Sequence, residues 1–242
     1  MAALNPLTTT AMYEVTNAHP LTLIVIISAF LVTPIYAMAT YVFSGASKKK
    51  GLRVGAGFLV FGTLMFWVCI ADIPRRLGLP GNLIIPTVWI LPSLILFLRK
   101  DWFLDRWLCQ KWLIGLQLFR VIGRVFLIEM VRGNIPGVFA YPAGVGDLAV
   151  ALVAALVLLK YWNAKRIPGA AVYLVIILGV ADFMSAFFFG FGSSETPIQL
   201  FFPEVPNNVI VFPTGLIPLF FVPYAIFFHT LSWLSYRKFE KA

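Results

Sequence analysis

Four polar residues recur at helical spacing within an otherwise apolar stretch: Gln110, Gln117, Arg120 and Arg124. Their separations of seven, three and four residues place them on one face of an α-helix, which has 3.6 residues per turn. An arginine near the centre of a membrane costs about 2.5 to 3.5 kcal/mol on insertion scales, and a second arginine one turn away adds to that cost. The sequence therefore predicts that acidic side chains from other helices face these two arginines.

The acidic residues best placed to face them are Asp147 and Asp182. Arg124 lies about twelve residues, or roughly 18 Å at the α-helical rise, from the inner end of its helix, and Asp182 is expected at a similar level in its own helix. We expect Glu129 and Asp72 in the outer half, together with Asp147. The predicted intramembrane polar site, with no catalytic residue and no metal ligand assigned, contains the following residues: Arg120, Arg124, Gln117, Asp147, Asp182, Glu129, Asp72 and His229.

These charges have two interpretations, and both remain open. Two arginines and two aspartates sum to zero, so they could be internal ion pairs that only fix the register of the helices. Alternatively, Arg120 and Arg124 hold an anionic group or tune the acids, while Asp147 and Asp182 bind a proton or a cation.

The last apolar stretch adds two helix breakers and a histidine. Pro218 and Pro223 free backbone carbonyls there, which occurs in transport sites and equally in simple helix kinks. His229 follows near the expected cytoplasmic end, where we expect an interfacial hydrogen-bonding residue.

Apolar runs separated by short basic segments predict the helices that carry these residues. Hydrophobic residues make up 60% of the 242 residues and charged residues 12%, whereas about a quarter of a soluble domain is charged. A span needs about 20 residues of helix to cross about 30 Å of hydrocarbon. The sequence thus predicts an all-α polytopic membrane protein, a single bundle over residues 1–242 with about seven transmembrane helices. The expected spans are 21–43, 54–73, 83–98, 112–130, 142–162, 168–191 and 213–235, to within a few residues.

The third span is short and interrupted by Pro86 and Pro92, so a re-entrant segment with five or six true spans is the alternative. Lysine and arginine concentrate in the segments that share one side of seven spans, and such segments face the cytoplasm. This predicts an N-terminus outside, a C-terminus in the cytoplasm and a multi-pass protein of the cell membrane, an inner membrane if bacterial. Five tryptophans fall near the same boundary: Trp102, Trp107, Trp112, Trp162 and Trp233.

Two connecting segments have a predicted character of their own. Residues 99–111 alternate charged and bulky apolar side chains, which predicts a short amphipathic helix in the cytoplasmic interface. Residues 192–212 are expected to form a long outer loop. Cys69 and Cys109 fall at opposite boundaries, so they are not expected to form a disulfide.

The sequence lacks the residues that several classes of function require. The net charge of +9 comes from basic residues spread over short loops, which membrane orientation explains better than a nucleic-acid partner. No lysine lies in the core of an expected span to form a retinal Schiff base. His19 and His229 lie on opposite sides and cannot both ligate one haem. No cofactor and no metal is predicted.

The residues Gly144–Asp147 spell Gly-x-Gly-Asp, a string found in intramembrane aspartyl proteases, and Asp182 could supply the second carboxylate. However, the second acid follows the string instead of preceding it, no Pro-Ala-Leu element follows, and the arginines would hold both acids ionised. Glycines that let helices approach closely explain the string as well. Protease activity is therefore the least favoured alternative, and an enzyme is not the favoured prediction.

Several segments resemble a family of bacterial seven-helix membrane proteins without an established activity. The similarity is best in the C-terminal half and rests on these segments: Phe119–Arg124, Gly133–Pro136, Phe139–Asp147, and Pro218–Pro223 with His229 and Ser232. The resemblance implies a bacterial membrane setting and no catalytic role.

The favoured prediction is transport, or binding of a small molecule or ion, at a polar site among the fourth to seventh spans. The alternative is a non-catalytic subunit of a larger membrane complex, such as a pigment or redox complex. In that case an aromatic surface would contact other membrane subunits in addition to the lipid bilayer: Phe187–Phe189, Phe201, Phe202, Phe220 and Phe221.

Overall fold

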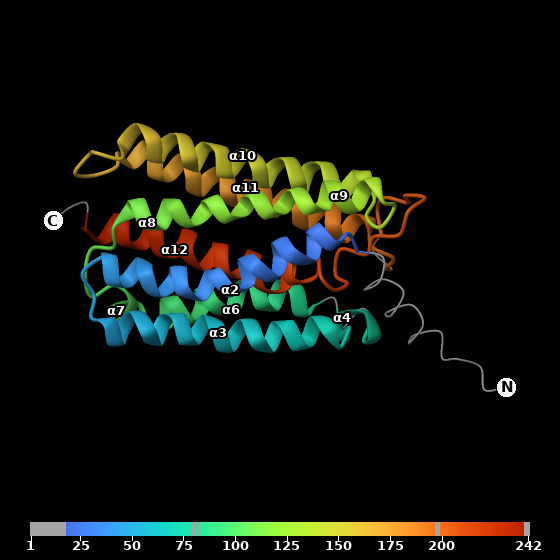
Figure 1. The fold of residues 1–242 in the computed structure, drawn as a ribbon, viewed down its shortest axis with the longest axis horizontal. Coiled ribbons are helices and arrows are strands. Elements are labelled where there is room, and N and C mark those ends of the chain that lie inside the picture. Colours follow the sequence, from blue (N-terminus) through green and yellow to red (C-terminus); the bar gives the residue numbers. More distant parts are fainter. Residues whose placement is uncertain (1–17, 79–80, 82, 197–198, 240–242) are drawn as a thin grey trace.

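The computed structural model describes residues 18–78, 81, 83–196 and 199–239, and all regular secondary structure in these ranges is helical. The helices lie along one long axis, with α2 beginning at one end and α12 finishing at the other (Figure 1). The longer helices are α2 (Pro20–Phe43), α3 (Lys48–Ile70), α6 (Ile84–Leu98), α10 (Gly137–Tyr161), α11 (Gly169–Ser193) and α12 (Val222–Phe239). Short helices α4 (Ile73–Arg76) and α7 (Lys100–Phe103) lie in the connections on either side of α6.

Residues 110–131 form a further rod along the same axis (Figure 1). It consists of three consecutive segments: α8 (Gln110–Gly115), the 3₁₀ helix η1 (Leu116–Arg124) and α9 (Val125–Val131). The sequence predicted one α-helix over 112–130, and the change of winding at its centre was not expected.

Within the described ranges, five helical segments are long and apolar enough to cross a membrane, which confirms an all-helical fold with helices of membrane-spanning length. They are α2, α3, α10, α11 and the segment Ile217–Phe239, where the π-helical turn η2 (Ile217–Phe221) leads into α12. Helix α6 is apolar but has only 15 residues. Apolar side chains such as Ile24, Val60 and Leu159 are exposed on the outer faces of these helices, as expected where the solvent is lipid.

Local sequence signals set several helix ends. The side chains of His19 and Ser47 accept hydrogen bonds from backbone N–H groups in the first turns of α2 and α3. Pro136 and Pro168 stand immediately before α10 and α11 with extended backbones. Gly133 provides the left-handed conformation, with φ of 75°, that reverses the chain after α9.

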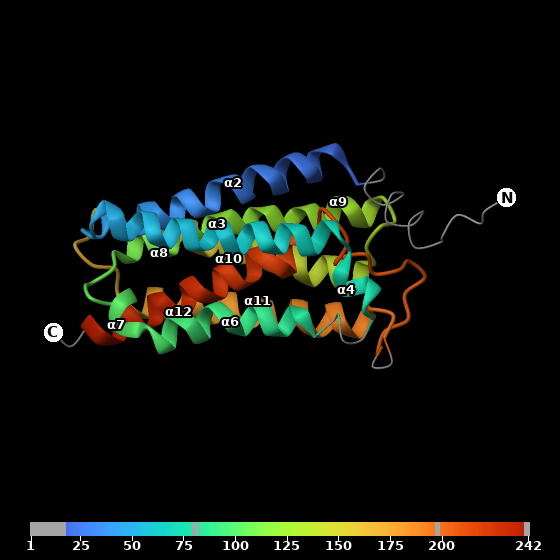
Figure 2. The same ribbon diagram turned by 90° about the horizontal axis from the view of Figure 1, so that it is seen from below.

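Of the five span-length segments, Ile217–Phe239 is the most deeply buried, and its aromatic side chains contribute much of the core. In the view of Figure 2, the ribbon of α12 runs between those of α3 and α6. Just before it in η2, Phe220 and Phe221 are 0% and 1% exposed, and the Phe220 ring lies 5.1 Å from the ring of Phe30. The prediction that these two phenylalanines form an outer aromatic surface is therefore wrong, because η2 lies inside the bundle. Of the other residues predicted there, Phe188 and Phe202 are exposed.

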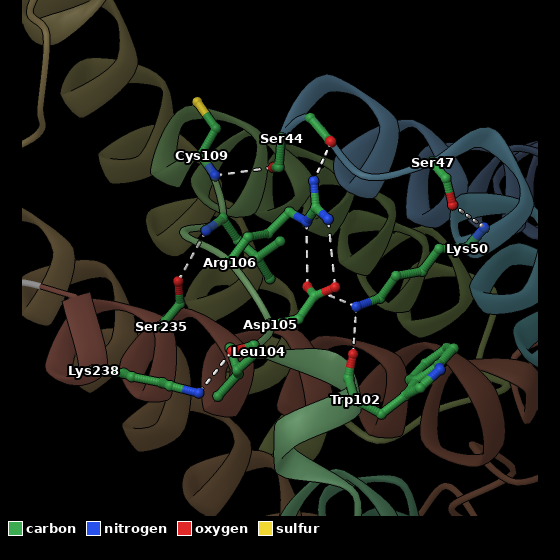
Figure 3. Close-up of polar contacts among 12 residues, drawn as sticks. Ser44, Ser47, Lys50, Trp102, Leu104, Asp105, Arg106, Cys109, Ser235 and Lys238 are labelled. Atoms are coloured by element: carbon green, nitrogen blue, oxygen red, sulfur yellow. Dashed lines mark hydrogen bonds and ion pairs between the residues drawn. The ribbon is translucent and has the colours of Figure 1, made fainter.

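The connection between α6 and α8 differs from the predicted interfacial helix over 99–111. Only the single turn of α7 is helical before α8 begins, and residues 104–109 have no regular structure. Side-chain contacts fix this segment instead (Figure 3). The carboxylate of Asp105 lies 2.8 Å from Nζ of Lys50 and also pairs with Arg106, and Arg106 in turn donates to the carbonyl of Gly45.

This ion pair should make stability depend on pH. Partial burial raises the pKa of Asp105, but hydrogen bonds and charges from Lys50 and Arg106 outweigh it and hold the pKa below its ordinary value of 3.8. The stabilisation is therefore complete above pH 3.8 and is lost as the pH falls through the lowered pKa. We expect Asp105→Asn to lower the free energy of unfolding by less than about 1 kcal/mol at neutral pH, as for other partly exposed ion pairs.

Thermal unfolding of the wild type and of Asp105→Asn in detergent tests this expectation. The difference between their melting temperatures should close as the solution is acidified. The matched control is Asp101→Asn. The side chain of Asp101 is 88% exposed, and its ion pair with Lys238 is long, at 3.9 Å, so its charge should contribute little to stability. A difference for Asp105→Asn that is the same at every pH would contradict the role assigned to its charge.

Candidate functional site

The 3₁₀ segment η1 carries the central residues of the site. Runs of 3₁₀ helix longer than three or four residues are uncommon, and η1 has nine. Gln117 and Arg120 are separated by three residues, one full 3₁₀ turn, so both point into the bundle and each is 1% exposed.

Arg124 does not share this face, although the α-helical spacing predicted that it would. Between Arg120 and Arg124 the 3₁₀ winding adds about 80° of rotation relative to an α-helix. The side chain of Arg124 is accordingly exposed, and no ion pair joins it to an acid within the described ranges. The predicted pairing of Arg124 with Asp182 is wrong, and Asp182 pairs with Arg120 instead.

The guanidinium of Arg120 lies between the two predicted aspartates. Its Nε donates to Oδ1 of Asp147 at 2.7 Å, and its Nη2 donates to Oδ2 of Asp182. The side chains of Asp147 and Asp182 are 13% and 7% exposed. The ring of Phe183 covers the guanidinium at 4.0 Å. Helices η1, α10 and α11 thus each contribute one charge, and the three charges sum to −1 when both acids are ionised.

Three glycines allow this close approach. A Cβ on Gly146 would lie 1.7 Å from Oδ1 of Asp182, and one on Gly123 would lie 2.1 Å from Oδ2 of Asp147. A Cβ on Gly179 would meet Nε2 of His229 at 2.2 Å. Close packing therefore explains the glycine at position 146 of the Gly-x-Gly-Asp string. This supports the explanation that the string lets helices approach closely over the explanation that it marks a protease.

His229 lies in the interior and not near the cytoplasmic end where we expected it. It is 3% exposed, next to Gly179, whose carbonyl accepts a hydrogen bond from Nη1 of Arg120 at 3.4 Å. One turn further along α12, the hydroxyl of Ser232 donates to Oε1 of Gln110 at 2.6 Å. Helix α12 therefore supplies a fourth wall of the site.

Several buried polar atoms near Arg120 have no hydrogen-bond partner among the described residues: Nε2 and Oε1 of Gln117, Oδ1 of Asp182 and Nε2 of His229. An unpaired buried polar atom costs about 1 to 3 kcal/mol. Such groups commonly hydrogen-bond to internal water or to a ligand. Internal water is therefore the expected partner of these buried atoms.

A cavity of about 60 Å³ adjoins the two aspartates. Its wall is largely aromatic, and these rings contribute to it: Trp89, Phe126, Phe139, Phe183, Phe187 and Phe191. Asp147 and Asp182 are the charged residues of its lining. The lining of the cavity includes Ser194 and Val209, in the connection between α11 and η2. Figure 1 shows this connection at the end of the bundle where α2 begins.

Glu129 and Asp72 are both buried, but their contacts lie elsewhere. Glu129 accepts hydrogen bonds from the hydroxyl of Thr22 at 2.5 Å, from the backbone of His19 at 3.0 Å and from Asn134 at 2.7 Å. It thereby ties α9 to the start of α2, and it does not join the Arg120 site.

Asp72 stands between α3 and α4 in a left-handed conformation, with φ of 52°. Burial raises its pKa, and the charges of Arg75 and Arg76 oppose that rise. Its surroundings are thus the turn after α3 and not the charged cluster around Arg120.

The aromatic wall of the cavity was not predicted from the sequence, and Phe187, which was predicted on an aromatic contact surface, lines the cavity. Phe183 directly follows Asp182, and Phe187 and Phe191 follow at intervals of four residues, which is the signal for one face of α11. No sequence pattern indicated Trp89 of α6, because its position depends on how α6 packs against α12 and η2. Its indole N–H donates to the carbonyl of Pro218 in η2 at 2.7 Å.

Comparison with known proteins adds a family but no activity. No curated protein and no solved structure matches the chain. Residues 81–235 match a family described as a domain of unknown function, DUF8737. The matched region contains Arg120, Asp147, Asp182 and His229, and thus the whole charged cluster. Because the match covers more than half of the sequence, this chain belongs to the DUF8737 family.

Proposed function

We propose that this chain is a transport protein that binds a proton or another small cation at the Arg120 site. The observation that carries the proposal is the charge imbalance: one buried guanidinium faces two buried carboxylates. Four charges were expected to sum to zero, but Arg124 is exposed and takes no part. An uncompensated charge in the membrane interior is costly, so a bound proton or cation that neutralises it is favoured.

The proposed topology has seven spans. To the five span-length helices we add α6 and the rod of residues 110–131, which reaches about 33 Å even at the α-helical rise. An odd number of spans agrees with α2 beginning and α12 finishing at opposite ends of the bundle (Figure 1). The loops rich in lysine and arginine lie at the end where α12 finishes, so we assign that end to the cytoplasm of a cell membrane.

Labelling of single cysteines in whole cells tests this topology. Cys109, which is partly exposed, is first replaced by serine. Single cysteines are then introduced as Asn163→Cys, in the exposed turn before α11, and as Glu204→Cys, in the exposed segment before η2. A membrane-impermeant maleimide should label Glu204→Cys in intact cells and Asn163→Cys only after the cells are opened. The reverse pattern would overturn the orientation, and labelling of both in intact cells would overturn the odd number of spans.

Infrared difference spectroscopy of the purified protein between acidic and alkaline pH tests the site. We expect the C=O band of a protonated carboxylic acid to titrate, and Asp182→Asn or Asp147→Asn to remove it. Asp72→Asn, a buried acid outside the site, is the matched control and should leave that band unchanged. If neither Asp182→Asn nor Asp147→Asn alters any titrating carboxyl band, and addition of Na⁺ or K⁺ leaves the wild-type spectrum unchanged, the proposed function is wrong.

The alternative of a non-catalytic subunit now rests on fewer residues. Phe220 and Phe221 are core residues, which leaves Phe188 and Phe202 as the strongly exposed members of the aromatic surface. Native mass spectrometry after mild detergent extraction distinguishes the two functions, because stoichiometric partner proteins would favour the subunit.

A further inference from the structure

We propose that the cavity beside Asp147 and Asp182 binds a monovalent organic cation with an aromatic or branched apolar body. The proposal rests on the proposed function, because the same two aspartates supply the charge. It goes further by naming the class of ligand that the cavity accepts.

The lining of the cavity indicates an organic ligand. Pockets for small molecules are mostly apolar with a few polar groups, and the lining of this cavity has that character. The aromatic rings of its wall, such as Trp89, Phe139 and Phe187, would surround an apolar body. The faces of such rings also attract cations.

The charge of the ligand follows from which groups reach the cavity. Asp147 and Asp182 line it, whereas the guanidinium of Arg120 does not. Arg120 instead borders a separate cavity of about 10 Å³, which Asp147 also lines, and its guanidinium lies against the ring of Phe183. The cavity beside both aspartates is therefore adjacent to two carboxylates with the positive charge behind them, which favours a cation and disfavours an anion.

The placement of Asp182 defines what it offers a ligand. Its Oδ2 accepts from Arg120, and its Oδ1 has no hydrogen-bond partner among the residues described but lies against Gly146 of α10, where a Cβ would stand 1.7 Å from it. Asp182 therefore acts on the cavity through its negative charge and not through an open hydrogen-bond acceptor.

An organic cation fits this lining better than a metal ion does. Ca²⁺ takes six to eight oxygen ligands and Mg²⁺ six, and both bind hard oxygen donors. Besides the two carboxylates, the side chains that line the cavity offer one hydroxyl, that of Ser194. In the described parts of the chain no three His, Cys, Asp or Glu residues are grouped to hold a metal. An alkylated ammonium needs no such coordination shell.

Cation and proton then compete for one negative charge. A ligand that enters while the aspartate pair holds a proton forms an ion pair with the carboxylate, and the carboxylic acid releases its proton to water. Each bound cation therefore displaces one proton. Exchange of this kind would couple movement of the organic cation to movement of a proton in the opposite direction.

Benzyltrimethylammonium and neopentylbenzene provide a matched test, because they have the same shape and differ only in charge. We expect saturation-transfer NMR and calorimetry on the purified full-length protein to detect binding of the ammonium at least about tenfold tighter than binding of its carbon isostere. Benzenesulfonate, an aromatic anion, should not bind. In weakly buffered solution, binding of the ammonium should release about one proton per protein.

Two variants locate the binding. Asp182→Asn should weaken binding of benzyltrimethylammonium about tenfold or more, and Asp72→Asn should leave it unchanged. Ala186→Leu places a larger side chain in the cavity and keeps all three charged residues, so it should also abolish binding and decides the matter if Asp182→Asn does not fold.

The outcomes separate the two proposals. Equal binding of the ammonium and its isostere, or binding that survives Ala186→Leu, would overturn the organic-cation site. A carboxyl band that titrates and disappears in Asp182→Asn, together with no ammonium binding, would also overturn it but leave the proposed function standing. If there is no ammonium binding, no such band, and no change of the wild-type spectrum on addition of Na⁺ or K⁺, both proposals fail.

Discussion

Arg120→Gln is expected to lower the free energy of unfolding by about 3 to 5 kcal/mol, the typical cost of removing one partner from a buried ion pair. The substitution leaves the carboxylates of Asp147 and Asp182 facing each other without the cation between them. Unfolding of the purified variant by heat or by increasing fractions of denaturing detergent measures the loss.

A second substitution should recover part of that loss. We expect Arg120→Gln with both Asp147→Asn and Asp182→Asn to be more stable than Arg120→Gln alone, because the triple variant buries no net charge. The matched control is Arg124→Gln on the same helix, where exposure predicts a change within about 0.5 kcal/mol. A larger effect at Arg124 than at Arg120 would show that the charged cluster is centred on the wrong arginine.

Asp182→Asn alone should be tolerated better than Arg120→Gln. It leaves Arg120 paired with Asp147, a neutral pair joined at 2.7 Å. Because the expected loss of stability is smaller than for Arg120→Gln, Asp182→Asn is a usable variant for the binding and infrared measurements.

Gly146→Ala is the second substitution with a large expected effect. The added Cβ would stand 1.7 Å from Oδ1 of Asp182, so α10 and α11 must separate or the carboxylate must leave Arg120. Overpacking of this kind costs about 1 to 3 kcal/mol and occasionally more. Thermal unfolding measures the loss of stability, and the titrating carboxyl band reports whether the site is disturbed.

Gly57→Ala is the control for that experiment. Gly57 also lies within a long helix, α3, but a Cβ there would meet nothing within 4 Å. Because alanine favours helix by up to about 1 kcal/mol over glycine, we expect this variant to be as stable as the wild type or more stable. Similar losses at the two glycines would mean that helix flexibility, and not space for the carboxylate, explains Gly146.

The parts of the fold that follow from apolar length and charge could be predicted from sequence. Asp147 and Asp182 were identified because an acid within a long apolar run must find a partner, and both partner Arg120. Which arginine pairs with them could not be predicted. The spacing of Arg120 and Arg124 fits an α-helix, and no local sequence pattern indicates the 3₁₀ winding of η1.

The remaining errors share a cause in tertiary packing. Phe220 and Phe221 have the composition of a lipid-facing surface, and only the central position of η2 and α12 buries them. His229 was placed too near the cytoplasm for the same reason. In residues 99–111 the alternating pattern suggested a helix, but the contacts of Asp105 with Lys50 and Arg106 hold the chain in an irregular form (Figure 3).

The winding of η1 has a mechanical consequence. A 3₁₀ helix rises about 2.0 Å per residue and an α-helix 1.5 Å, so rewinding nine residues as α-helix would shorten the rod by about 4.5 Å. The same rewinding would turn Arg124 by about 80° toward the aspartates, relative to Arg120. Like the turning of a screw, the rewinding couples the two changes. When the rod shortens, a second arginine, Arg124, comes to face Asp147 and Asp182.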